Sequence, residues 1–465
     1  MASTATSPAV FNFFYFFIIT FGYFSSISLA DSSSTFPAEA LPTKSGYLTV
    51  NSTTGSAIFY TFYEAQNPIS TPAHTPILVW LQGGPGCSSM IGNFYELGPW
   101  RVSSSGGKQI SLVSNPGAWN RKFGLLFLDN PIGVGFSISS TPEEIPRNQR
   151  DVARHLFIAI RKFIALDADS FKSRPIYITG ESYAGKYVPA IGYYILKVNA
   201  HLRQSSRVNL AGVAIGNGLT HPVAQVATHA INAYNLGLIN DHQKAQLEEL
   251  QEVAISLTEQ ENWSEATRAR SLVLDTLQNM TGLATLMDFR RQMPYEDALV
   301  ADFLNNNEIK RVLKAKEAIK FETCGDLVGK VLGPDVMKSV KYMVEFLVKN
   351  TKVLLYQGQC DLKDGVVSTE AWIKTMEWEG LGEFLAAGRR VWMTNNGEEV
   401  AGYVQKYGNL THVVVLAAGH LVPADQSLNA QAMIENWVLE NRSPAMMPQN
   451  RISSNTKARV PHFSE

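Results

Sequence analysis

The chain has 465 residues, of which 45% are hydrophobic, and its formal net charge is −1. A chain of this length and apolar content can bury a large core, and its balanced charge, without a long cluster of Lys and Arg, excludes nucleic acid as a partner. No CxxC or HExxH motif and no cluster of His and Cys with metal-ligand spacing occurs, so we expect no metal site and no cofactor.

Residues 1–30 are predicted to be a secretory signal peptide. Residues 10–24 are almost entirely apolar, and Ser28 and Ala30 suit cleavage after Ala30. No Lys or Arg precedes the apolar run, so an uncleaved anchor is the alternative, although the run is short for a span. Since no later stretch is long and apolar enough to span, we expect no membrane association after cleavage. The predicted location is the extracellular space or cell wall, with the vacuole as the alternative.

Five N-x-S/T sequons are candidate glycosylation sites in a secreted chain. They lie at Asn51, Asn262, Asn279, Asn409 and Asn441. Pro444 follows the last sequon directly, which makes Asn441 the weakest acceptor.

Residues 31–221 alternate short apolar stretches with amphipathic ones. Buried strands are predicted at "TPILVWLQ" (75–82), "GLLFLDN" (124–130) and "NLAGVAIGNG" (209–218), and a further strand ends at Thr179. Helices are predicted over 151–165 and 184–195. This alternation predicts an α/β fold with a central, mostly parallel sheet, of which residues 31–221 form the first part.

Residues 222–320 have helical periodicity and no convincing strand, so we interpret them as a helical lid inserted into the core. Residues 321–441 are predicted to be the second part of the core, with strands at 352–358 and 411–419 and a helix after Pro423. Residues 442–465 form a polar tail.

The stretch "ITGESYAGKYVPA" (178–190) places Ser182 at the turn between a predicted strand and a predicted helix. Gly180 and Gly185 flank it, and we interpret the stretch as the G-x-S-x-G nucleophile elbow. A Gly-Ser turn without catalytic function is the alternative. Catalysis would require a base, an acid and an oxyanion hole elsewhere in the chain.

In α/β hydrolases the acid and then the histidine follow the serine in chain order, each after a late strand. Asp361 follows the strand at 352–358, and His420 follows the strand at 411–419. The histidine would remove the serine proton, and the carboxylate would fix the imidazole tautomer. Asp364 is the alternative acid, and His412 is the alternative base.

The glycine-rich "WLQGGPGCSS" (80–89) follows a predicted strand and supplies unobstructed backbone N–H groups. The N–H groups of Gly84 and of Tyr183, the residue after the nucleophile, are the predicted oxyanion donors. A tight turn without function is the alternative.

The blocks "WLQGGPGCSS", "NPGAWN", "FLDNPIGVGFS", "GESYAGKYVPA" and "AAGHLVPADQ" resemble the signature blocks of the serine carboxypeptidase family over about residues 45–440. The resemblance implies an α/β-hydrolase fold with a helical lid, no cofactor, and an enzyme that releases single residues from the C-termini of peptides or proteins.

Carried over residue by residue, the resemblance implies Ser182 as nucleophile, His420 as base and Asp361 as its orienting acid. Gly84 and Tyr183 match the oxyanion positions. Recognition of the substrate carboxylate would fall to Gln82, Gly83, Glu96 and Glu181. The family pattern also pairs Cys87 with Cys324, which leaves Cys360 as a free thiol.

Two positions depart from the common family pattern. Gln82 stands where most members have Asn, and Gln359 stands where most have Asp. Both resemble the vitellogenic-like and retinoid-inducible branch. The longer Gln82 amide therefore puts carboxylate affinity and residue preference in question.

Two further functions compete with the peptidase prediction. Plant relatives with this fold transfer acyl groups from glucose esters, although such acyltransferases commonly carry Asp where this chain has Glu181. A catalytically inert binding protein is the other alternative. For a peptidase, two glutamates facing a substrate carboxylate predict that at least one is protonated, and hence an optimum at about pH 4.5–6.

Overall fold

The computed structural model describes residues 36–105, 109–394 and 397–440. The predicted signal peptide (1–30), the polar tail (442–465) and the sequon at Asn441 lie outside these residues.

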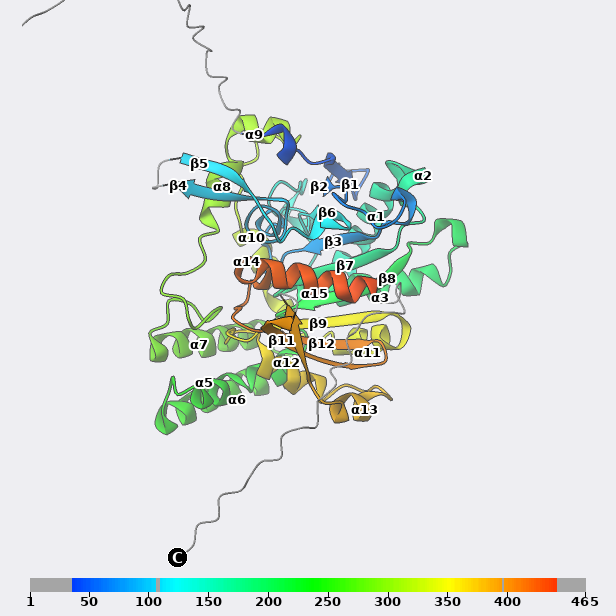
Figure 1. Ribbon diagram of the computed structural model, residues 1–465. Coiled ribbons are helices and arrows are strands. Elements are labelled where there is room, and N and C mark those ends of the chain that lie inside the picture. The colour runs from blue at the N-terminus through cyan, green and yellow to red at the C-terminus, as the bar shows by residue number, and fades with distance from the viewer. Residues whose placement is uncertain (1–35, 106–108, 395–396, 441–465) are drawn as a thin grey trace, which may run out of the picture. The chain divides into compact units, whose positions relative to one another are not determined.

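A ten-stranded sheet forms the centre of the described chain, in the order β1-β2-β6-β3-β7-β8-β9-β12-β11-β10 (Figure 1). The strands from β6 to β12 in this order are parallel, and two antiparallel strands flank them at each edge. The bounds are β1 (Lys44–Thr49), β2 (Ala57–Tyr63), β3 (Ile77–Leu81), β6 (Gly124–Leu128), β7 (Ile176–Glu181), β8 (Leu210–Gly216), β9 (Lys352–Gly358), β10 (Arg390–Thr394), β11 (Glu399–Tyr407) and β12 (Leu410–Val415). A separate hairpin pairs β4 (Trp100–Ser105) with β5 (Gln109–Ser114).

Helices cover both faces of this sheet. On one face α1 (Gln149–Ala165), α3 (Ala184–Asn199) and α11 (Lys341–Asn350) pack against strand residues such as Val79. On the other face α15 (Ser427–Leu439), orange-red in Figure 1, packs against residues such as Leu78. Successive strand residues point to opposite faces, so a strand covered on both sides must be apolar throughout, as β3 is.

Between β8 and β9 the described residues form helices and no strand. Helices α5 (His229–Asn235), α6 (Asp241–Glu259) and α7 (Trp263–Thr281), green in Figure 1, share an apolar cluster of their own that includes Leu247 and Val273. The others in this stretch are α4 (Pro222–Val226), α8 (Ala298–Leu304), α9 (Asn307–Val312), α10 (Asp326–Leu332) and α11. We call residues 222–320 the helical insertion.

The remaining short helices lie in the connections. They are α2 (Ala168–Phe171), α12 (Val366–Ile373), α13 (Leu381–Ala386), α14 (Val422–Asp425), the π-helix η3 (Gly92–Glu96) and the 3₁₀ turns η1 (Ala38–Ala40), η2 (Pro72–His74), η4 (Trp119–Arg121), η5 (Pro142–Glu144), η6 (Gln204–Ser206) and η7 (Gly333–Asp335).

The predicted α/β class and mostly parallel sheet are confirmed, but two details differ. The strand expected at 411–419 ends at Val415, because Ala417 turns the chain with φ +51°. The outer strands β1, β2, β10 and β11 and the β4–β5 hairpin were not predicted. β1, β10 and β11 are half-buried or exposed over most of their length, so they lack the continuous apolar run that marks a buried strand.

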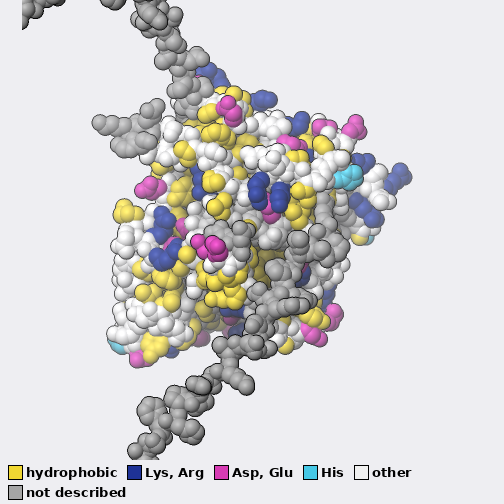
Figure 2. Space-filling model, in the orientation of Figure 1, with side chains coloured by type: hydrophobic (Ala, Val, Ile, Leu, Met, Phe, Trp, Pro, Cys, Tyr) yellow, Lys and Arg dark blue, Asp and Glu magenta, His cyan; other side chains and the backbone are white. Residues whose placement is uncertain are grey.

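Among the described residues, no helix is long and apolar enough to cross a membrane. On the face shown in Figure 2, hydrophobic side chains are interspersed with charged ones of both signs.

Candidate active site

Ser182 lies at the turn between β7 and α3. Its backbone has φ +60°, a left-handed conformation that is strained for a residue with a Cβ. Hydrogen bonds hold this conformation from both sides: Ser182 N–H donates to the Gly216 carbonyl, and the Ser182 carbonyl accepts from Leu219 N–H, both at 3.0 Å. Ser182 is partly exposed while its neighbours Glu181 and Tyr183 are buried, so the turn presents the hydroxyl to solvent.

Glycine is required on both sides of this turn. A Cβ on Gly180 would lie 2.4 Å from the Leu81 carbonyl oxygen, and one on Gly185 would lie 2.6 Å from Leu219 N. Ala184 is fully buried, so the intervening position accepts a methyl group. Ala184 stands where the G-x-S-x-G motif has its second glycine, and this departure leaves the elbow intact.

The structure brings Asp361 and His420 together from the carboxyl ends of β9 and β12. His420 Nδ1 lies 2.7 Å from Asp361 Oδ2, and both side chains are buried. The Asp361 carboxylate also accepts from the backbone N–H groups of Lys363 (2.7 Å) and Asp364 (3.2 Å). His420 Nε2 has no partner among the described residues, which leaves this nitrogen for a serine proton.

The alternative acid and base are engaged elsewhere. Asp364 Oδ1 lies 3.3 Å from Arg270 Nη2 of α7 in a buried ion pair. His412, inside β12, lies 2.6 Å from Gln357 Oε1, and burial lowers its pKa to about 3. Among the described residues, neither Asp364 nor His412 forms a hydrogen bond with Ser182 or His420, whereas Asp361 contacts His420 directly.

The glycine-rich segment lies directly against the elbow. A Cβ on Gly83 would be 2.6 Å from Tyr183 N and 2.7 Å from Ser182 Cβ, so only glycine fits there. Gly84 has φ +109°, a conformation that side chains rarely adopt, and it is exposed. The structure thus places the two predicted oxyanion residues, Gly84 and Tyr183, on adjacent segments beside the serine.

Glu181, one residue before the serine, and Glu96 both have buried carboxyl groups that contact the same amide. Gln82 Nε2 donates to Glu181 Oε1 at 2.8 Å and to Glu96 Oε1 at 3.1 Å, while its own Oε1 accepts from Trp80 Nε1 at 2.8 Å. The Gln82 amide therefore spans both acids. Gln is one methylene longer than the Asn that most family members have at this position, and its amide connects the two carboxyl groups.

Burial raises the pKa of Glu96 to about 7. Burial also raises the pKa of Glu181 well above its usual value, and the neighbouring Glu96 charge adds to the effect. Each carboxyl has an Oε2 with no donor among the described residues. Both shifts favour protonation of the pair, and a protonated carboxyl of one glutamate is a hydrogen-bond donor.

A disulfide joins Cys87 to Cys324, 237 residues apart in sequence. The backbone pairs on both sides of it: Ser88 N–H donates to the Thr323 carbonyl and Gly325 N–H to the Gly86 carbonyl, both at 2.8 Å. Cys360 is free and buried, and burial raises its pKa to about 11. The bond therefore ties the oxyanion segment to the chain that follows the helical insertion.

Comparisons with known proteins agree with this geometry. The family model described as serine carboxypeptidase matches residues 34–440. Serine carboxypeptidase-like 50 of Arabidopsis thaliana is 59% identical over 404 residues, which cover 87% of this chain and 89% of that protein. The chain belongs to the serine carboxypeptidase family.

Two further relatives support the assignment. The probable serine carboxypeptidase CPVL of Homo sapiens is 34% identical, covering 87% of this chain and 84% of that one. The crystal structure of Kex1(delta)p, a prohormone-processing carboxypeptidase from Saccharomyces cerevisiae, superposes with a TM-score of 0.77 at 25% identity, covering 88% and 93% of the two chains. The fold is the α/β-hydrolase fold, as the resemblance implied.

Sequence reasoning missed one residue that this serine carboxypeptidase places in the site. Asn217, just after β8, donates from Nδ2 to Asp361 Oδ2 at 2.7 Å and accepts from Gly358 N–H at 3.2 Å. Its φ of +42° is the left-handed conformation that Asn tolerates better than most residues. A polar residue in "IGNG", at the carboxyl end of a buried strand, was the available signal.

A second unpredicted feature is the segment 285–296, which lies within the helical insertion. The carbonyls of Leu286 and Met287 accept from the N–H groups of Leu362 (2.9 Å) and His420 (2.7 Å). Tyr295 donates to Asp425, which also accepts from Gly419 N–H, both at 2.7 Å. This segment therefore supports the loops that carry both the acid and the base.

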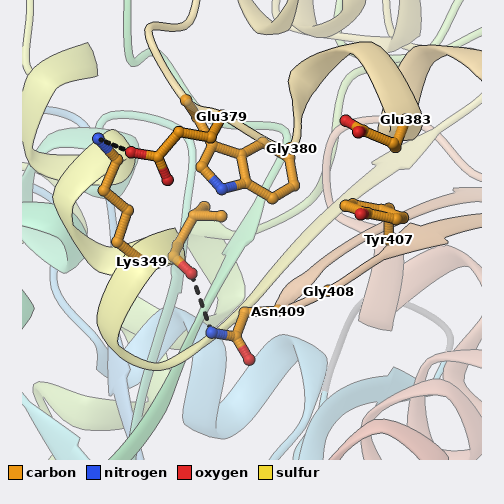
Figure 3. Close-up of a pocket in the computed structure, with 9 residues that line it drawn as sticks. Lys349, Glu379, Gly380, Glu383, Tyr407, Gly408 and Asn409 are labelled. Atoms are coloured by element: carbon orange, nitrogen blue, oxygen red, sulfur yellow. Dashed lines mark hydrogen bonds and ion pairs between the residues drawn. The ribbon is translucent and has the colours of Figure 1, made fainter.

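A cavity of about 530 Å³ lies away from this site (Figure 3). Lys349 and Asn409, which precede β9 and β12, line it together with Tyr407, whereas Asp361 and His420 follow the opposite ends of the same strands. The Asn409 sequon is exposed there, and its Nδ2 donates to the Val348 carbonyl at 2.9 Å. Asn262 and Asn279 are also exposed, and Asn51 is half-buried.

Proposed function

We propose that this serine carboxypeptidase releases single residues from peptide C-termini through a Ser182–His420–Asp361 triad. The observation that carries the proposal is the buried pair Glu96–Glu181, bridged by Gln82 beside the nucleophile. A protonated carboxyl and an amide can donate hydrogen bonds to a substrate carboxylate one residue beyond the scissile bond. An endopeptidase or esterase has no need for such a group.

The proposed reaction begins when Ser182 Oγ attacks the carbonyl carbon of the last peptide bond and its proton passes to His420 Nε2. The carbonyl oxygen becomes an oxyanion that accepts from the N–H groups of Gly84 and Tyr183. The C–N bond then breaks, His420 returns the proton to the departing amine, and the C-terminal amino acid leaves. Water attacks the acyl-enzyme with its proton passing to His420, and Ser182 is regenerated.

The titration of the two glutamates supports an acid optimum. As the pH rises through the upper pKa of the pair, the donor is lost and two carboxylates face the substrate carboxylate, so KM rises. We expect the optimum on the acid side, at about pH 4.5–6, where the pair keeps the proton that it donates to the substrate carboxylate.

The Cys87–Cys324 disulfide and the exposed sequons at Asn262, Asn279 and Asn409 support passage through the secretory route. With the predicted signal peptide, they favour secretion to the extracellular space or cell wall, with an acidic vacuole as the alternative.

The test compares an N-blocked dipeptide, the same dipeptide amidated at its C-terminus, and a sinapoyl-type glucose ester with an alcohol acceptor. We expect the free-acid dipeptide to be hydrolysed fastest, and Ser182→Ala to lose both hydrolysis and labelling by an organofluorophosphonate. Faster transfer from the glucose ester would favour the acyltransferase. Labelling without turnover of any substrate would contradict the proposal.

A further inference from the structure

We propose that Asp335 is a positioning residue for the oxyanion hole, acting on the Tyr183 N–H through the Tyr183 side chain. The inference rests on the proposed function, because it assumes that the Tyr183 N–H faces the developing oxyanion. It assigns a role to a carboxylate that lies outside the triad and outside the pair of glutamates.

The Tyr183 side chain points away from the catalytic face into the protein. Its hydroxyl donates to Asp335 Oδ2 at 2.8 Å, and Gln149 Nε2 donates to the same oxygen at 2.6 Å and lies 3.3 Å from the hydroxyl. All three side chains are buried. A tyrosine ring held at its far end by a charge-assisted hydrogen bond cannot rotate its backbone N–H freely.

Burying the Asp335 carboxylate costs free energy, so we expect its charge to have a function. It is buried and forms no ion pair among the described residues; its charge raises the pKa of the buried Lys186, which burial lowers, but Lys186 donates its hydrogen bond to the Lys338 carbonyl. A neutral Asn or Gln could accept the same hydroxyl hydrogen bond without burying a charge. The Asp335 charge makes the hydrogen bond from the Tyr183 hydroxyl shorter and stronger. A buried charge adds little to the stability of the core, so we interpret it as fixing the position of Tyr183.

The segment that contains Asp335 also fixes the position of Gly84, the other oxyanion donor. Asp335 lies eleven residues after Cys324, whose disulfide and neighbouring backbone bonds fix the segment that contains Gly84. A Cβ on Gly86 would lie 2.9 Å from the Gly325 carbonyl oxygen, so the two backbones are in direct contact. Residues 324–335 therefore contact both segments that carry an oxyanion donor. They contact the segment of Gly84 through the disulfide and Tyr183 through the hydrogen bond to Asp335.

The spacing of two oxyanion donors must be accurate, because their contribution depends on distances of about 2.7–3.1 Å to an oxygen that forms only during reaction. Loss of the anchor leaves substrate binding unchanged but lets the Tyr183 N–H drift. The expected effect is on kcat, because both acylation and deacylation pass through an oxyanion.

The test is Tyr183→Phe, which removes the hydroxyl and keeps the ring. We expect kcat for the dipeptide to fall about 10- to 100-fold with KM within about twofold. The matched control is Tyr177→Phe, near the start of β7, the strand that precedes Tyr183, where the lost hydroxyl donates to the Val438 carbonyl at 3.5 Å. The control should keep wild-type kcat.

Two acid-site variants separate positioning from a structural role. Asp335→Asn keeps a weaker, neutral acceptor for the hydroxyl and should lower kcat less than Asp335→Leu, which should match Tyr183→Phe. Stability is followed by thermal unfolding, and a change in kcat that tracks Tm across all four variants would overturn the inference. So would an active wild-type enzyme in which Tyr183→Phe has unchanged kcat. An inactive wild-type enzyme that also resists organofluorophosphonate would instead refute the proposed function.

Discussion

The buried pair Glu96–Glu181 should make both the KM for a free-acid substrate and the free energy of unfolding depend on pH. The variant Glu181→Gln separates the contribution of Glu96 from that of Glu181. The pKa of Glu96 is raised from 4.5 to about 7, mainly by burial. At about 1.4 kcal/mol per unit, ionising Glu96 costs roughly 3 kcal/mol more in the folded protein than in the unfolded chain. The Gln amide cannot ionise, so the variant keeps a donor beside Glu96 at high pH and loses the part of the pH dependence that comes from Glu181.

The sign follows from proton binding. Between about pH 4.5 and 7 the folded protein binds more protons than the unfolded chain, so the free energy of unfolding decreases as the pH rises. The contribution is fully present below the unfolded pKa and is lost by the time the pH passes the folded pKa. In wild type we expect Glu96 to contribute a loss of roughly 3 kcal/mol over this range.

The assay is urea unfolding of wild type and Glu181→Gln at pH 5 and pH 7.5, with KM for an acid and an amide dipeptide at each pH. The variant should lose less stability between the two pH values than wild type. Its KM for the acid should rise less as well, while the KM for the amide stays nearly flat in both proteins. A wild-type KM for the acid that is constant from pH 5 to 8 would refute the shared-proton reasoning.

The remaining predictions concern the residues around the pair and the triad. Asn217→Ala removes a hydrogen bond of about 1.5–3 kcal/mol to the Asp361 carboxylate, so kcat should fall about 10- to 100-fold in steady-state assays; an unchanged kcat would place the orienting role elsewhere. Asp361→Asn should reduce kcat about 10⁴-fold, whereas Asp364→Asn should keep kcat within a few-fold but lower Tm, because it leaves Arg270 buried without its carboxylate; the reverse pattern would make Asp364 the catalytic acid. Peptide mapping without reduction should yield a Cys87–Cys324 peptide, and a Cys360-containing disulfide would contradict the pairing; the loop it closes predicts a stabilisation of roughly 5 kcal/mol.

The features that the sequence predicted are those that depend on residues close together in the chain. The apolar runs at 75–82 and 352–358 identified β3 and β9 because strands buried on both faces carry that pattern. Ser182, Asp361 and His420 could be found because each follows such a strand. Asn217 could not, since its role depends on where the neighbouring strand delivers Asp361, 144 residues later.

The outer strands and the anchor at Asp335 show the other limit of sequence reasoning. β10 is exposed over much of its length and pairs with β11 with a register shift, so neither periodicity nor apolarity marks it. Asp335 lies in a short 3₁₀ turn with ordinary neighbours in sequence. Only the approach of α1 and the elbow, distant in the chain, gives its carboxylate partners.

The helical insertion contacts the loops that carry the proposed acid and base. Its segment 285–296 forms backbone hydrogen bonds with the loop after β9 and with His420 itself, and Arg270 of α7 neutralises Asp364 beside the acid. Backbone hydrogen bonds place few demands on side-chain identity, so the helices of the insertion can vary while the contact with the triad loops is kept. The position of the triad therefore depends on residues whose types would not mark them as functional.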